Sequence, residues 1–206
     1  MINLLKKYRR NKDGATAVSF ALNAGLVIIL TGATIEMGVA FWQWNTVQQA
    51  ARHGARLAAT SDPIASDISS MTGIGRGVGA GDSMPDFVRV CVGSSGVCSG
   101  GSYNSAAVSD LVFGPDHDNT CATNTKKRAG MCDIFSQIKA ENVTVEYRGS
   151  GLGTAGYPGQ PAPIITMRLT GLEYDFVFLD LVAPGMFKTM PDVEVSVMSE
   201  DLKTGS

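Results

Sequence analysis

Four cysteines are the side chains of this 206-residue sequence that are best suited to chemistry: Cys91, Cys98, Cys121 and Cys132. Structural zinc sites usually place paired cysteines about two to four residues apart. Here six residues lie between the first two cysteines and ten lie between the last two. This spacing argues against a zinc site, and we expect the chain to bind no metal ion and no cofactor.

One of these cysteines lies in a motif that could support nucleophilic catalysis. Cys98 stands in Gly-Val-Cys-Ser-Gly, which has the form of a nucleophile elbow with cysteine in place of serine. Its general base would be His117, because the other histidine, His53, lies in a helical stretch near the N-terminus. A disulfide to Cys91, seven residues away, is the simpler role for Cys98. We therefore predict that the chain is not an enzyme.

A second candidate ligand site is the acidic loop Asp116–Asp118. The EF-hand calcium pattern requires Gly at its sixth position and Glu at its twelfth, where this sequence has Cys121 and Lys127. A solvated loop is the favoured interpretation, and a weak, nonstandard calcium site stays open. The alternative function is an anchored enzyme or ligand-binding domain that uses Cys98 with His117, or this loop.

The charge distribution limits the partners of the chain. Its net charge is -2, from 17 Lys and Arg against 19 Asp and Glu, so no global positive field could hold a nucleic acid. Residues 1–13 nevertheless carry five basic side chains and one acidic side chain, a net charge of +4. Residues 45–206 carry 12 basic and 17 acidic side chains, a net charge of -5.

The basic head precedes a stretch that is suited to lipid. Residues 14–35 are 22 consecutive residues without a charge. An α-helix of that length spans roughly 33 Å, about the thickness of the hydrocarbon core. A secretory signal peptide has a shorter apolar core and a small-x-small cleavage site, for which Thr31-Gly32-Ala33 is a poor match. We predict a single-pass anchor whose head, residues 1–13, is cytoplasmic and whose remaining residues lie outside.

The helix is expected to continue beyond the membrane. Because no proline occurs before Pro63, we predict one transmembrane and stem helix over residues 14–60. Ala51 and Ala55 belong to a stripe of small residues that favours close contact with another subunit or with the chain's own sheet. Glu36, at the end of the apolar run, would either dock on another subunit or lie at the lipid interface.

The rest of the chain has the pattern of an α+β domain. Residues 61–86 are rich in Ser, Gly and Asp and are expected to form a linker, whereas residues 87–206 form the extracytoplasmic domain. A short amphipathic helix is predicted over Met131–Ala140 and a tight hairpin at Thr170–Leu172. Period-two alternation predicts antiparallel strands at Val143–Tyr147, Ile165–Leu169, Tyr174–Phe178 and Val193–Val197, with Phe87–Cys91 as a fifth. The apolar face of this sheet is expected to pack on the stem helix.

All four cysteines fall on the outer side of the predicted membrane, where disulfides persist. Four cysteines allow three pairings. We favour Cys91 with Cys98 and Cys121 with Cys132, because each pair closes a short loop that is rich in glycine or polar residues.

Three blocks in the N-terminal part of the sequence resemble a known family. Gly14 to Leu22 read Gly-Ala-Thr-Ala-Val-Ser-Phe-Ala-Leu, Glu36 follows the apolar run, and Ala50 to Arg56 read Ala-Ala-Arg-His-Gly-Ala-Arg. In order and spacing they resemble the TadE-like family (TadE/TadG type) of tight-adherence (Flp) pilus assembly proteins. The resemblance implies a pilin-like fold, a minor pseudopilin role in pilus assembly and cell adhesion, and an inner-membrane protein with a periplasmic C-terminal domain.

The resemblance also implies partners and a processing site. The partners would be other pilin-like subunits, the Flp pilus assembly platform and membrane lipid, with no nucleic acid and no small-molecule substrate. In pilins a peptidase cuts after a Gly that is followed five residues later by Glu, which here would be the bond between Gly14 and Ala15. Ser19 stands in place of that Glu. A permanent, uncleaved anchor is therefore the prediction that we prefer.

Overall fold

The computed structural model describes residues 13–75, 77–116, 120–121, 128–156, 161–186 and 188–199. The chain divides into two compact units. The anchor unit contains Met1–Trp42 and Asp175–Lys188, and the sheet unit contains Gln43–Tyr174 and Thr189–Ser206. Helix α2 (Asp13–Thr60) contributes its first part to the anchor unit and its second part to the sheet unit.

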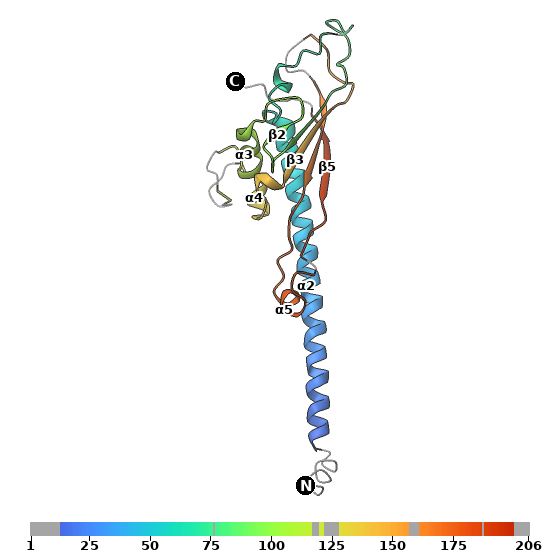
Figure 1. Cartoon of the computed structure of the whole chain (residues 1–206), viewed down its shortest axis with the longest axis vertical. Coiled ribbons are helices and arrows are strands. Elements are labelled where there is room, and N and C mark those ends of the chain that lie inside the picture. The colour runs from blue at the N-terminus through green and yellow to red at the C-terminus, as the bar shows by residue number, and fades with distance from the viewer. Residues whose placement is uncertain are drawn as a thin grey trace. The chain divides into compact units, whose positions relative to one another are not determined.

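Helix α2 is 48 residues long, which confirms the predicted single helix over residues 14–60. Its sequence contains no proline, and its last turns are rich in alanine, the residue with the highest helix propensity. The helix ends at Thr60, and Pro63 follows where a further helical turn would need a backbone N–H. Figure 1 shows α2 in blue to cyan.

The sheet unit contains a five-stranded antiparallel sheet in the order β2-β1-β3-β4-β5. Its strands are β1 (Val88–Val92), β2 (Val97–Cys98), β3 (Val143–Gly149), β4 (Pro163–Leu169) and β5 (Val193–Met198). Together with the long helix, this sheet confirms the predicted α+β fold class. Strands β2 and β5 form its two edges, and Figure 1 shows the longer strands beside the second part of α2.

The strand predicted at Tyr174–Phe178 is wrong. Strand β4 pairs with β5 instead, so the hairpin predicted at Thr170–Leu172 is wrong as well. Phe178 begins the five-residue helix α5 (Phe178–Val182), and residues 175–188 belong to the anchor unit. The alternating apolar residues therefore mark a segment that packs on the first part of α2, which a period-two pattern cannot distinguish from a strand.

The sheet unit also contains short helices. They are α3 (Ser105–Phe113), α4 (Met131–Ile134) and the 3-10 turns η1 (Ile68–Ser70) and η2 (Ala140–Asn142). The helix predicted over Met131–Ala140 is too long, because Phe135 adopts extended dihedrals (φ -138°, ψ 104°). Helix α3 was not predicted, although Asn104 caps it by accepting hydrogen bonds from the N–H groups of Ala106 and Ala107.

The core of the sheet unit lies between α2 and the apolar face of the sheet. Its buried residues include Val47, Ala50, Ala51, Ala55 and Ala58 from α2, and Val145, Tyr147, Ile165 and Met167 from β3 and β4. Gly54 on α2 leaves no room for a side chain, because a Cβ there would overlap Sδ of Met131 and lie 2.7 Å from Sδ of Met167. The helix thus approaches its neighbours as closely as small residues permit.

The segment expected to form a linker, residues 61–86, contributes to this core. Ile64, Ala65 and Ile68 are at most 1% exposed. The backbone N–H of Ile64 donates a hydrogen bond of 3.0 Å to the hydroxyl oxygen of Tyr147, which is fully buried on β3. Burial raises the pKa of the Tyr147 phenol, so the neutral form is the one that the core accommodates.

We expect Gly54→Ala to destabilise the sheet unit by about 1–3 kcal/mol, because the new methyl group overlaps two methionine sulfurs. Gly38→Ala is a matched control on the same helix, since a Cβ at Gly38 meets no atom within 4 Å. The control should leave the stability unchanged or raise it by up to about 1 kcal/mol through helix propensity. Chemical denaturation of both variants in detergent measures the difference, and equal stabilities would contradict the close packing.

We expect Tyr147→Phe to cost about 1–3 kcal/mol at neutral pH, because the buried N–H of Ile64 loses its acceptor. The unfolded tyrosine ionises at pH 10.0 and the folded one above it, so this side chain supports folding fully below pH 10 and loses that contribution as the pH rises further. Urea unfolding at pH 8 and pH 11 tests this difference. The variant should lose less stability between the two pH values than the wild type.

Candidate membrane-anchor site

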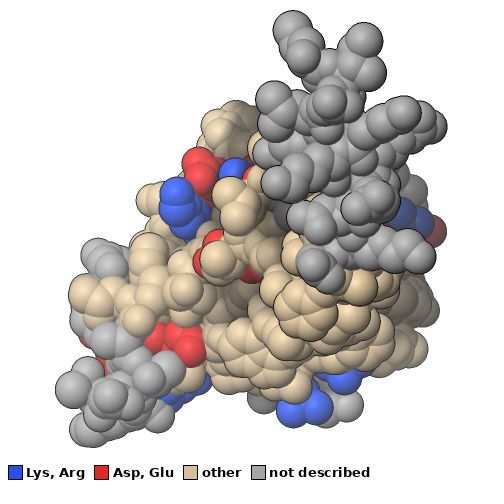
Figure 2. Space-filling view, turned by 90° about the horizontal axis from the view of Figure 1, so that it is seen from below, with Lys and Arg blue, Asp and Glu red and all other residues tan. Residues whose placement is uncertain are grey.

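The first part of α2 presents an apolar surface that the described residues do not cover. A window of this helix has a mean hydropathy of 1.9 with 0% of it buried. Phe20, Leu22 and Ile28 are 75%, 71% and 63% exposed, which is unlike the core helix of a globular domain. Figure 2 shows a face whose described surface is mostly uncharged, with acidic and basic side chains in small separate groups. By length and composition, α2 is the described helix that could cross a membrane.

The residues of the predicted processing site lie in the first turns of α2. Gly14, Ala15 and Ser19 are all exposed. The backbone carbonyl of Ser19 accepts a hydrogen bond of 2.8 Å from the side-chain amide of Asn23. A Cβ at Gly14 would meet no atom within 4 Å, so packing gives no reason for glycine at this position. Cleavage between Gly14 and Ala15 stays a prediction.

Glu36 lies near the end of the uncharged run and binds a distant part of the anchor unit. Its carboxylate accepts hydrogen bonds from three backbone N–H groups: those of Val177 at 2.7 Å, Leu179 at 2.5 Å, and Phe178. The first N–H groups of a helix have no partner within that helix, and no side chain of its own caps α5. Glu36, which is 8% exposed, caps α5 across 141 to 143 residues of sequence.

A close contact one turn earlier on α2 holds the same segment. A Cβ at Gly32 would lie 2.9 Å from Cε1 of Phe178, so the phenyl ring packs directly on the helix backbone. Gly32 and Glu36 are four residues apart and share one face of α2. Glycine therefore admits the ring while the carboxylate binds the amides beside it. Glu36, predicted to contact lipid or another subunit, contacts its own chain here.

Ala51 and Ala55 were predicted to contact another subunit or the chain's own sheet. Both side chains are 0% exposed and belong to the core of the sheet unit. The small-residue stripe therefore packs on the chain's own sheet, which is one of the two roles that its pattern left open. No open surface is left at these two positions.

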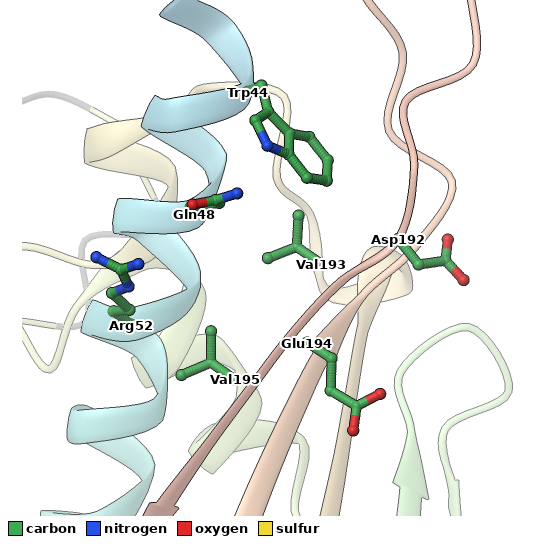
Figure 3. A pocket seen from close by; sticks show the side chains of 7 residues that line it. All are labelled: Trp44, Gln48, Arg52, Asp192, Val193, Glu194 and Val195. Atoms are coloured by element: carbon green, nitrogen blue, oxygen red, sulfur yellow. The ribbon is translucent and has the colours of Figure 1, made fainter. Parts of the chain in front are cut away.

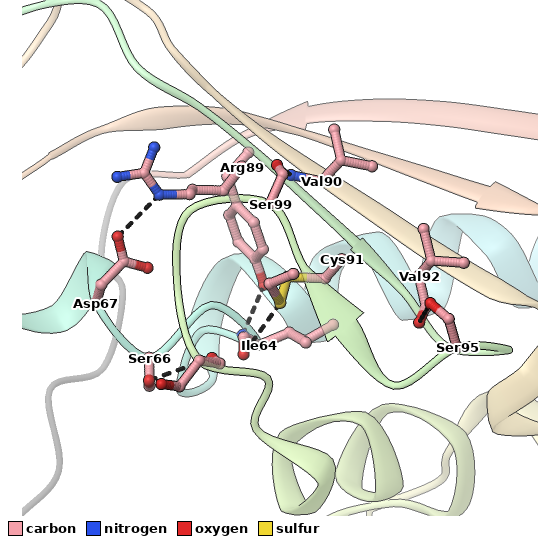
Figure 4. The surroundings of a disulfide bond; sticks show 12 residues. Ile64, Ser66, Asp67, Arg89, Val90, Cys91, Val92, Ser95 and Ser99 are labelled. Atoms are coloured by element: carbon pink, nitrogen blue, oxygen red, sulfur yellow. Dashed lines mark hydrogen bonds and ion pairs between the residues drawn. A yellow bond between two sulfur atoms is a disulfide. The ribbon is translucent and has the colours of Figure 1, made fainter.

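The cysteines form two disulfides, Cys91–Cys98 and Cys121–Cys132, in the pairing that loop length favours. The first bond joins residues that face each other across β1 and β2. Figure 4 shows its surroundings, where Arg89 on β1 forms an ion pair of 2.8 Å with Asp67. Because Cys98 is oxidised, it offers no thiolate for the alternative Cys98–His117 site.

The other candidate ligands do not assemble into a site within the described residues. His117 and Asp118 lie outside the described residues, and Asp116 is exposed. The Nε2 atom of His53 lies 2.8 Å from the backbone carbonyl oxygen of Ala129, which is a structural contact on α2. In the part of the chain that the structure describes, no group of three or more His, Cys, Asp or Glu side chains could hold a metal ion.

A pocket that the sequence analysis missed lies between α2 and the edge strand β5. It has a volume of about 290 Å³ and is lined by Trp44, Gln48, Arg52 and residues 192–195 (Figure 3). Arg52 is its cation, and of its two carboxylates Glu194 already pairs with Arg168 at 2.8 Å. The four-residue spacing of Trp44, Gln48 and Arg52 indicates that they share one face of the helix. The strand that completes the pocket is distant in sequence, so no local pattern indicated it. Its location beside a sheet edge suits contact with a polypeptide better than catalysis.

We expect Glu36→Ala to expose the amides of Val177 and Leu179 to exchange, since the substitution removes their acceptor. Their hydrogen–deuterium exchange should accelerate by roughly tenfold or more, whereas the amides of β3 and β4 should keep their rates. Glu141→Ala serves as the matched control, because this carboxylate is 63% exposed and pairs only loosely with Lys139, at 3.6 Å. Equal exchange in the two variants would contradict the capping role of Glu36.

Comparison with known proteins locates a family resemblance on this same helix. The family model described as TadE-like protein matches residues 14–56, which are 43 of the 206 residues. No curated protein and no solved structure matches the chain. The matched range includes the exposed apolar turns, Glu36, and the part of α2 that packs on the sheet. The resemblance predicted from the sequence is confirmed for residues 14–56, which are similar to the TadE-like family.

Proposed function

We propose that the chain is a membrane-anchored, minor pilin-like component of tight-adherence (Flp) pilus assembly that acts through protein association. The observation that carries this proposal is the match of residues 14–56 to the TadE-like family, on a helix whose first part is apolar and exposed. The second part of that helix packs on an antiparallel sheet, an arrangement in keeping with a pilin-like protein.

The proposed location is the bacterial inner membrane, with the head in the cytoplasm and the sheet unit in the periplasm. The net charge of +4 over residues 1–13, five basic against one acidic, supports this orientation. The two disulfides support it independently, since such bonds persist in the oxidising compartment outside the cytoplasm. Both observations support a location of the sheet unit on the outer side of the membrane.

The proposed partners are other pilin-like subunits and the platform that assembles the Flp pilus. The features proposed for association are the edge strand β5 of the described sheet and the adjacent pocket lined by Trp44 and Arg52. An edge strand presents unpaired backbone groups, and an arginine beside an aromatic ring is typical of contact surfaces between proteins. No catalytic step and no small-molecule substrate form part of this proposal.

We further propose that the chain stays uncleaved as a permanent anchor. In pilins the carboxylate five residues after the cleaved glycine pairs with a neighbouring subunit, and here Ser19 offers a hydroxyl group instead. A hydroxyl group cannot neutralise the amino terminus that cleavage after Gly14 would create within lipid.

The test combines a deletion in the native host with analysis of the protein extracted from its membranes. We expect the deletion strain to lose its surface pili and the wild-type gene to restore them. The intact mass of the extracted protein should correspond to a chain that begins at Met1. Chemical crosslinking before extraction should join the protein to pilin-like subunits. A mature chain that begins near Ile35 would overturn the anchor, and normal piliation of the deletion strain would overturn the role in assembly.

A further inference from the structure

We propose that residues 175–188, the anchor loop, form a second membrane-contacting segment that lies in the outer boundary between headgroups and acyl chains. The occupant of this apolar surface is lipid of the same bilayer that α2 spans. The inference rests on the membrane anchor of the proposed function but not on its role in pilus assembly.

Three large apolar side chains of the anchor loop are strongly exposed. Val177, Leu181 and Met186 are 84%, 79% and 71% exposed. The first two exceed every other large hydrophobic side chain of the described residues in exposure, including those of the first part of α2. Leu181 lies within α5, and Val177, four residues earlier, is the N-cap residue of this helix. Strongly exposed large apolar side chains that gather in one short segment favour a contact with a partner or with a membrane.

The charges of the anchor loop are distributed as an interfacial segment requires. Asp175 and Lys188 stand at its two ends, and Asp180 is the charged residue between them. Asp180 accepts a hydrogen bond of 3.3 Å from the backbone N–H of Gly185, so its carboxylate is turned toward the loop's own backbone. The ends of the loop can thus remain in the polar layer while its middle enters the acyl boundary.

Several backbone N–H groups of the anchor loop have partners within the anchor unit, as a lipid environment favours. The Glu36 carboxylate accepts hydrogen bonds from the backbone N–H groups of residues 177–179. The N–H of Ala183 donates to the carbonyl of Leu179 at 2.8 Å, and that of Met186 donates to the carbonyl of Ala183 at 3.3 Å. A loop in water could leave these groups to the solvent, whereas a loop in lipid cannot. Satisfied amides beneath exposed apolar side chains therefore favour lipid over water.

The position of the contact along α2 indicates the depth of the loop. Gly32 and Glu36, which hold the loop, lie at the C-terminal end of the uncharged run of residues 14–35. That run spans roughly 33 Å, so its end coincides with the outer edge of the hydrocarbon core. Phe41 and Trp42, 69% and 66% exposed, follow at the level where aromatic residues anchor membrane helices.

Tryptophan fluorescence in liposomes tests the proposal with the full-length protein. Trp42→Phe and Trp44→Phe together remove both natural tryptophans. In this background Leu181→Trp places a single probe on the anchor loop, and Met186→Trp provides a second, independent probe. The proteins are reconstituted in phosphatidylcholine whose acyl chains are brominated either near the headgroup or deep in the chain, because bromine quenches tryptophan only at short range.

Two matched probes define the range of the measurement. Val27→Trp, at a side chain 57% exposed within the uncharged run, reports the hydrocarbon core, and Leu152→Trp, at a side chain 53% exposed in the sheet unit, reports water. We expect both loop probes to lose most of their emission, more strongly with shallow than with deep bromine, and to emit at shorter wavelength than the Leu152→Trp probe.

Each outcome of this experiment decides the proposal. Quenched loop probes support it. Loop probes that stay unquenched while Val27→Trp is quenched would overturn it and leave the anchor intact, which is also the result expected if another protein covers the loop. An unquenched Val27→Trp probe would overturn the membrane anchor of the proposed function together with the loop inference.

Discussion

The structure depends on a single helix, α2, whose two parts must suit two different surroundings. Along the first part of α2 the apolar side chains point outward, and along the second part small residues face a sheet. Gly54 shows how strict the second requirement is, because even a methyl group would overlap two methionine sulfurs. The choice of side chain beyond Asn45 is therefore limited by the volume that the packed core allows. Before Glu36 it is limited by the requirement for apolar side chains.

Glu36 marks the transition between these two requirements. An isolated carboxylate near the edge of the hydrocarbon core is costly, and so is a short helix whose first amides are unpaired. In the anchor unit one contact satisfies both groups, because the Glu36 carboxylate accepts hydrogen bonds from the N–H groups at the start of α5. Gly32 admits the ring of Phe178 beside this contact, so polar and apolar interactions act on adjacent residues.

Sequence patterns predicted the elements that local periodicity defines. The extent of α2, four of the strands and the cysteine pairing follow from residue types that lie close together in the chain. The strand expected at Tyr174–Phe178 failed because alternating apolar residues also suit a segment packed on a helix. The partner of Glu36 lies 141 residues or more away, and no local pattern reports such a distance. The pocket lined by Trp44 was not predicted for the same reason, because β5, which is distant in sequence, completes it.

That separation has a consequence for how the protein is made. The ribosome must add 141 residues after Glu36 before the first of its amide partners exists. The carboxylate therefore enters the membrane without its partners, and the hydrophobic run before it must secure insertion unaided. Pairing follows only after most of the chain has been synthesised. Biogenesis thus has a fixed order, in which the helix is inserted first and its cap on α5 closes last.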